Sequence, residues 1–119
     1  MIKSLGDRTT EDLYHRTSSA KMRRLPPELQ TLALYKLYVL NAVVALRELR
    51  SPPGNSLEAL KGDLIGFHSM RINKQWRIIF KWQRAEALDV RIADYHSLRG
   101  SKYYDSIKSN KHPSRNNTP

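Results

Sequence analysis

The apolar residues of this chain change their spacing part-way along, from a helical period to alternation. After residue 28 they recur every three or four positions, which is typical of a helix with one face packed on a sheet; they are Leu29, Leu32, Ala33, Leu37 and Leu40. Pro26 and Pro27 favour a helix start, because the first turn does not need their missing N–H groups. We interpret Asn41 as a break before a second short helix at 42–49. The two helices would then form a helical hairpin.

Alternating residues predict three strands farther along, at 67–72, 76–83 and 88–95. Successive side chains of a strand point to opposite faces of the sheet. The set predicted to pack on the helices is apolar: Met70, Ile72, Trp76, Ile78, Phe80, Trp82, Leu88, Val90 and Ile92. The opposite set is largely cationic: Ser69, Arg71, Arg77, Ile79, Lys81, Arg91, Ala93 and Tyr95. The pattern predicts an α+β domain whose sheet has one apolar and one basic face.

Smaller elements are predicted near the N-terminus. Residues 2–5 alternate and indicate a short edge strand. Thr10 is a plausible N-cap for a brief helix at 11–15, because its oxygen can accept a first-turn amide. Residues 18–24 are polar and basic, and we expect a loop there.

The bulk composition predicts one domain. With 119 residues and 39% apolar content, the chain supports a single core. We assign residues 1–96 to that domain and 97–119 to a basic extension, largely disordered beyond residue 109. The absence of cysteine excludes disulfides and thiolate metal sites. The histidines are too scattered for a zinc site, so we expect no metal or other cofactor. Neither a signal peptide nor a membrane span is apparent, which favours a soluble cytoplasmic protein.

The charge indicates an anionic partner. The formal net charge is +10, and the first 96 residues alone hold 16 basic and 10 acidic side chains. The charge is therefore not confined to the extension. Such a field favours nucleic acid, a ribosomal surface or an acidic protein. A basic but merely solvated surface is the alternative.

The end of the last predicted strand holds candidates for proton transfer. Metal-free RNA cleavage needs a base, an acid and cations placed together. His96 is the natural proton-transfer group because imidazole titrates near neutral pH, although a surface histidine at a strand end is the alternative. Tyr95 could donate a proton, stack on a base or pack at the sheet edge. Asp94 is better suited to orienting a neighbouring cation than to acting as a base. We expect His68 to be a strand histidine with its hydrogen bonds satisfied.

Two cations complete the candidate chemistry. Arg77 on the basic face suits bidentate binding of a phosphate, or a salt bridge to Asp89 or Asp94. Lys61 precedes Gly62, where a sharp turn would let the backbone approach a ligand. Neither residue is decisive alone.

Five segments in this order resemble the HigB-type toxins of the RelE/ParE superfamily, also called plasmid-maintenance killer proteins. They are MIKSL, RSPPGN, LEALKGD, SMRINKQWRIIFKW and the closing DYH, and together they span residues 1–96. The resemblance implies a small RelE-like domain, with a helical hairpin packed on a largely antiparallel β-sheet. It also implies a metal-independent endoribonuclease that cuts mRNA in the ribosomal A site and is neutralised by a HigA-type antitoxin.

The same resemblance assigns roles to residues. His96 would transfer protons, Lys61 and Arg77 would stabilise the phosphorane, and the active site would also include Asp94 and Tyr95. The residues that would contact the RNA backbone are Arg71, Lys74, Lys81 and Arg91. The chain departs from the family at Glu58, which stands where some members carry a second active-site histidine. Glu58 could serve as the general base, or His96 could act alone.

Two other functions are considered. Some members of the superfamily inhibit DNA gyrase by binding it, and an inactive relative could bind RNA without cutting it. Lys61, Arg77 and the closing DYH favour RNA cleavage, because a gyrase binder would not need them.

Overall fold

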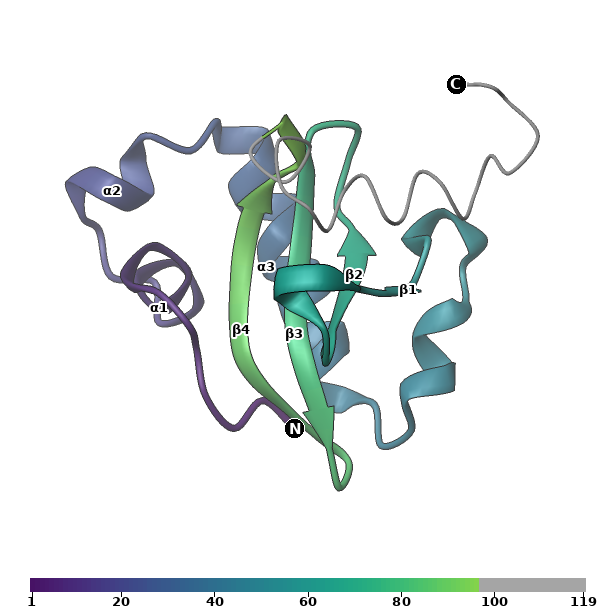
Figure 1. The fold of residues 1–119 in the computed structure, drawn as a ribbon. Helices are drawn as coiled ribbons and strands as arrows, with labels where there is room; N and C mark the ends of the chain where they lie inside the picture. Colours follow the sequence, from purple (N-terminus) through teal and green to yellow (C-terminus); the bar gives the residue numbers. More distant parts are fainter. Residues whose placement is uncertain (97–119) are drawn as a thin grey trace, which may run out of the picture.

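The computed structural model of the chain describes residues 1–96 (Figure 1). Its helices are α1 (Arg8–Tyr14), α2 (Ala20–Arg23) and α3 (Pro27–Ala42), and its short 3₁₀ helices are η1 (Leu46–Arg50), η2 (Pro53–Asn55) and η3 (Gly62–Leu64). Its strands are β1 (Glu58–Ala59), β2 (Phe67–Arg71), β3 (Trp76–Gln83) and β4 (Glu86–Asp94). The extension predicted at 97–119 lies outside the described residues.

The four strands form one antiparallel sheet in the order β1-β2-β3-β4. The predicted N-terminal edge strand is present as two isolated parallel bridges beside β4, Ile2 to Ala87 and Leu5 to Val90. Helices cover one face of this sheet (Figure 1). The predicted α+β class and the largely antiparallel sheet are therefore confirmed.

Helix α3 forms the core with the sheet. Pro27 occupies its first turn, where the missing N–H costs little. The buried residues of α3 are Leu29, Ala33, Leu37 and Leu40, and the sheet residues in the same cluster include Met70, Ile78, Phe80, Ala87 and Val90. Trp76 and Trp82 pack against this cluster, as predicted. Leu32 does not belong to the buried stripe and is exposed.

The predicted helical hairpin is wrong in its second helix. Helix α3 continues through Asn41, whose Oδ1 accepts a hydrogen bond from the Ile2 amide at 2.8 Å. Val43 is extended and ends the helix. The Glu48 carboxylate accepts hydrogen bonds from the backbone amides of Val44 and Ala45 at 3.1 and 2.7 Å. The residues that follow form the 3₁₀ helix η1 and not the predicted second α-helix. The other two α-helices, α1 and α2, precede α3 in the sequence.

The N-terminal predictions also need correction. Helix α1 begins before Thr10 and is capped by Asp7, whose Oδ1 accepts from the Thr10 amide at 2.9 Å. The buried Thr10 hydroxyl accepts from the Ile92 amide at 3.0 Å and so joins α1 to β4. The loop predicted at 18–24 contains helix α2, because the Ser19 hydroxyl caps the Met22 amide.

A bulge in β4 changes which residues face the core. Ile79 pairs with Arg91, but Lys81 pairs with Leu88. The extra residue is accommodated where Asp89 has a φ of 52°. Leu88 consequently shares a face with Lys81, and the prediction that it faces the helices is wrong. Ala87 takes the core position and is fully buried.

The face opposite the helices is only partly basic. Leu60, Phe67 and Ile79 form a second buried cluster, with Leu64 and Ala93 packed against it. The segment that contains β1 and η3 lies across this face (Figure 1). The face that was predicted to be basic therefore has an apolar centre with basic side chains around it.

In the part of the chain that the structure describes, no helix is both long and apolar enough to cross a membrane.

Candidate active site

The turn between β2 and β3 builds one end of the site. Asn73 Oδ1 accepts hydrogen bonds from the backbone amides of Gln75 and Trp76 at 2.9 and 2.8 Å. An asparagine side chain bonded in this way stabilises a chain reversal. The Tyr95 amide then donates to the Gln75 carbonyl at 2.6 Å, which extends the pairing of β4 to this turn.

This pairing brings Arg77 against Tyr95. The Arg77 guanidinium carbon lies 4.5 Å from the centroid of the Tyr95 ring. Arg77 Nη1 donates to the carbonyls of Asn73 and Trp76 at 2.7 and 3.1 Å. Asp89, one of the predicted salt-bridge partners of Arg77, has its Oδ2 at 3.7 Å from Lys81 Nζ. The Tyr95 ring and the two backbone carbonyls therefore fix the position of the Arg77 guanidinium.

Asp94 and His96 form a second pair at the end of β4, where the His96 ring centroid lies 6.4 Å from that of Tyr95. Asp94 Oδ1 accepts from the His96 amide at 2.8 Å and lies 3.2 Å from His96 Nδ1. Asp94 Oδ2 accepts from Gln75 Nε2 at 3.2 Å. Burial raises the pKa of Asp94, but the hydrogen bonds from the His96 amide, Gln75 and the His96 ring together outweigh it and leave that pKa below its ordinary value.

An ionised Asp94 fixes the orientation of His96. A carboxylate at Nδ1 favours the tautomer with its proton on Nδ1. Nε2 is then the nitrogen left for an exchangeable proton. The His96 side chain is 65% exposed, so a ligand can reach it from solvent. This geometry agrees with the orienting role predicted for Asp94.

Arg71 lies directly opposite Arg77 in the pairing of β2 and β3. Two like charges facing one another across strands destabilise a sheet unless an anion lies between them. Arg71 is exposed, and both residues are on the face that carries Tyr95. Arg71 and Arg77 are therefore suited to binding a phosphate together.

The β1–η3 segment carries Glu58 and Lys61, and it places Glu58 on the face that carries Arg77. Glu58 pairs with Ser69, in the cross-strand row that continues to Ile79. Lys61 is exposed and immediately precedes η3. Gly62 has a φ of 61°, as the predicted sharp turn requires.

The remaining predicted RNA contacts are spread more widely. Lys74 is exposed in the turn before β3. Lys81 and Arg91 each lie 5.1 Å from the Phe67 ring centroid, so both contribute to packing around the second cluster. Lys81 is four residues from Arg77 along β3, roughly 13 Å at the usual rise of a strand.

Gln75 was not predicted from the sequence as a site residue, and the prediction for His68 was wrong. Gln75 holds both Asp94 and the Tyr95 backbone, and the only signal for it was the Asn73 turn that precedes it. His68 stacks on Phe80 with ring centroids 5.9 Å apart, but its Nδ1 is buried without a hydrogen-bond partner. Burial lowers the pKa of His68 and favours its neutral form. The prediction that its hydrogen bonds are satisfied is therefore wrong.

Within residues 1–96, no three His, Asp or Glu side chains gather as a metal site would require.

Comparison with known proteins identifies the family. Residues 4–96 match the sequence profile described as the RelE-like toxin of type II toxin–antitoxin system HigB. The chain is also 39% identical over 89 residues to Toxin HigB-1 of Vibrio cholerae serotype O1, an alignment that covers 75% of this chain and 92% of that protein. The chain belongs to the HigB family of RelE-like toxins.

Two further proteins are similar to this HigB-family chain. An uncharacterized protein of Haemophilus influenzae is 35% identical over 74 residues, which cover 62% of this chain and 72% of that protein. The crystal structure of YafQ from Escherichia coli strain BL21(DE3) superposes with a TM-score of 0.51 at 13% identity, over 82% of this chain and 98% of YafQ. At that identity the likeness to YafQ concerns the fold alone.

Proposed function

We propose that this type II toxin is a metal-independent, ribosome-dependent endoribonuclease that cleaves mRNA in the A site. We further propose that residues 1–96 are the toxin domain, that it acts in the cytoplasm and that a HigA-type antitoxin neutralises it. The observation that carries the proposal is the exposed His96 ring, which is held by Asp94 and lies 6.4 Å from the ring of Tyr95, the residue that packs on Arg77. This cluster combines a proton-transfer group with a cation for phosphate.

The proposed reaction is an in-line transesterification. The 2′-oxygen of the nucleotide before the cut loses its proton and bonds to phosphorus, and the bond from phosphorus to the 5′-oxygen breaks. Glu58 accepts the 2′-proton, and His96 Nε2 donates a proton to the leaving 5′-oxygen. The products are a 2′,3′-cyclic phosphate and a free 5′-hydroxyl. A positioned acid or base contributes about 10²- to 10⁴-fold to such a rate.

The cations stabilise the charge that develops on phosphorus. Arg77 and Lys61 would contact the non-bridging oxygens of the phosphorane. Arg71, together with Lys74, would hold the neighbouring phosphates. Tyr95 fixes the Arg77 guanidinium through its ring face.

An open site favours a substrate that is already ordered. The His96 side chain is 65% exposed at the end of the sheet, so the described residues do not enclose the reacting groups of an RNA strand around it. An mRNA held in the A site would already be positioned, which supports dependence on the ribosome.

The function is tested with purified chain, mRNA and 70S ribosomes with an empty A site. Primer extension should detect cuts only when ribosomes are present, and DNA supercoiling by gyrase should be unchanged. Intact mRNA together with inhibited supercoiling would support the gyrase-binding alternative. Intact mRNA with normal supercoiling would indicate an inactive relative.

A further inference from the structure

A small pocket lies at the edge of the sheet beside β1, and the proposed chemistry does not use it. It encloses about 160 Å³, and its lining residues are Leu46, Arg47, Arg50, Leu57, Ala59 and His68. The first three belong to η1, whereas Ala59 and His68 lie opposite one another in the pairing of β1 and β2. A cavity of about 150 Å³ accepts a ring of the size of benzene. The pocket therefore has room for one planar ring.

Two arginines lie on the rim of this pocket. Side chains three residues apart eclipse one another in a 3₁₀ helix, so Arg47 and Arg50 project from the same side of η1. Both are exposed, and in the part of the chain that the structure describes neither side chain forms a hydrogen bond or salt bridge. The carboxylate of η1, on Glu48, accepts instead from the amides of Val44 and Ala45. Two adjacent arginines that this carboxylate does not neutralise favour binding of a phosphate.

His68 supplies an aromatic ring to the pocket. Ala59, His68 and Phe80 occupy one cross-strand row of the sheet. The imidazole stacks on the Phe80 ring, with centroids 5.9 Å apart and planes inclined by 24°. Ala59, on the other side of His68 in this row, carries only a methyl group and leaves the histidine accessible to the pocket. Burial lowers the pKa of His68 and favours the neutral ring. Such a ring is suited to stacking on a nucleobase.

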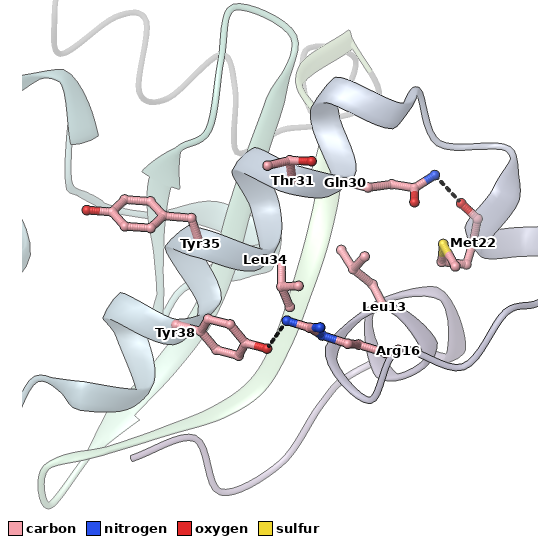
Figure 2. A pocket seen from close by; sticks show the side chains of 8 residues that line it. All are labelled: Leu13, Arg16, Met22, Gln30, Thr31, Leu34, Tyr35 and Tyr38. Atoms are coloured by element: carbon pink, nitrogen blue, oxygen red, sulfur yellow. Dashed lines mark hydrogen bonds between the residues drawn. The ribbon is translucent and has the colours of Figure 1, made fainter.

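A larger hollow between α1, α2 and α3 does not combine these features (Figure 2). It encloses about 610 Å³, and of the described residues that line it only Arg16 is cationic. The Arg16 guanidinium donates to the Tyr38 hydroxyl at 3.3 Å (Figure 2). The pocket beside β1 therefore fits a ligand with a planar ring and a phosphate better than this hollow does.

The pocket and the proposed general base lie on opposite sides of the edge strand. β1 is the edge strand of the sheet, and successive residues of a strand point to opposite faces. Glu58 therefore points to the face of the candidate active site, and Ala59 points to the face that carries His68 and the pocket. The Cα atoms of two consecutive residues are about 3.8 Å apart. An RNA strand bound at Glu58 can thus continue over the edge of the sheet to His68.

We propose that this pocket binds a nucleotide of the mRNA next to the one that is cut, with its base on the His68 ring and its phosphate between Arg47 and Arg50. The proposal rests on the proposed nuclease activity and adds a substrate subsite to it. The nucleotide in the pocket takes no part in bond breaking. It holds the mRNA in position against Glu58 and His96, which is the way that binding remote from the reacting atoms assists a reaction.

NMR titration of the full-length protein tests the occupant directly. The probe is a 2′-O-methyl RNA hexamer, which has no free 2′-hydroxyl and cannot be cut. The ring signals of His68 should shift when the hexamer binds, whereas those of His15, an exposed histidine outside the pocket, should not. Binding of the hexamer without a shift of the His68 signals would overturn the proposal.

Removal of the two rim charges tests the phosphate contact. In the double variant Arg47→Gln, Arg50→Gln, the Kd for the hexamer should rise at least about tenfold. The control is Arg23→Gln, Arg84→Gln, which removes two exposed arginines outside the pocket and changes the net charge equally. Its Kd should rise less than about threefold. Equal Kd values for the two double variants would mean that only the overall charge of the protein matters.

Filling the pocket tests the base contact without a change of charge. Ala59→Leu covers the His68 ring, and we expect its KM for mRNA on 70S ribosomes to rise at least about fivefold, the loss of one stacked base. Its kcat should stay within about twofold, because the pocket does not touch the reacting groups. Ala42→Leu, at an exposed alanine outside the pocket, is the control and should cleave like the wild type. Both variants should unfold in one cooperative thermal transition. A lower kcat with an unchanged KM in Ala59→Leu would contradict a positioning role.

Two further comparisons separate the pocket from other accounts. Ala59→Leu should bind 70S ribosomes without mRNA as the wild type does, and a weaker affinity there would identify ribosomal RNA as the occupant and overturn the proposal. Hexamer binding is read without ribosomes, so an inactive RNA-binding relative would still show the predicted His68 shift. Normal cleavage by Ala59→Leu and by the Arg47, Arg50 variant would count against the pocket and leave the nuclease proposal intact.

Discussion

At the scale of single residues, the candidate active site depends on a carboxylate and an imidazole that are neighbours in sequence and in space. Asp94 and His96 are two residues apart, so their proximity follows from the chain itself, and the sequence could predict it. Gln75 could not be predicted, because its contact with Asp94 depends on the geometry of the Asn73 turn. The same holds for Arg77 and Tyr95, which meet only because Tyr95 pairs with Gln75.

Asp94→Asn tests the orienting role. The amide keeps the shape of the side chain but removes the carboxylate that orients the His96 ring, so cleavage should fall about 10- to 100-fold. Because hydrogen bonds hold the pKa of Asp94 below its ordinary value of 3.8, its carboxylate stabilises the fold above that value. This contribution is lost as the pH falls through the lower pKa of the folded state. Urea midpoints of wild type and variant should therefore differ above pH 4 and converge in stronger acid. A constant difference at all pH values would contradict this.

At the scale of elements, β2 and β3 could be predicted from the sequence because the alternation of apolar and polar residues is a local pattern. The bulge at Asp89 could not be predicted, because an extra residue in β4 is recognised only from its pairing with β3. The prediction for Leu88 failed for this reason. The cover of the second face by Leu60 and Leu64 was missed because two-residue strands and short 3₁₀ helices have no periodicity. The end of α3 was misplaced because Asn41 serves a tertiary contact rather than a cap.

Gly6→Ala tests how tightly the N-terminal segment packs on β4. A Cβ at Gly6 would lie 2.6 Å from Arg91 Cγ and 2.8 Å from the Asp89 carbonyl oxygen, and the carbonyl belongs to backbone that cannot move freely. We expect a loss of about 1–3 kcal/mol in the free energy of unfolding, measured by urea denaturation. Gly54→Ala is the control, since a Cβ there would meet nothing within 4 Å. Equal stability of the two variants would show that this contact is not tight.

At the scale of the whole molecule, the helices and the candidate chemistry belong to different sides of one sheet. Helix α3 packs on one face, and Arg77 and Tyr95, which are proposed for mRNA, lie on the other. The basic charge of the chain favours an anionic substrate such as RNA. The helical cover was only partly predictable from the sequence, since residues 18–24 were expected to be a loop and instead contain helix α2.

The most direct test of the central claim is the rate at which His96→Ala cleaves ribosome-bound mRNA under single-turnover conditions. We expect a fall of at least about 100-fold, the contribution of one positioned proton-transfer group, while the variant still unfolds in one cooperative thermal transition. His15→Ala removes an exposed histidine outside the site and should cleave like the wild type. Cleavage by His96→Ala at the wild-type rate would contradict the account.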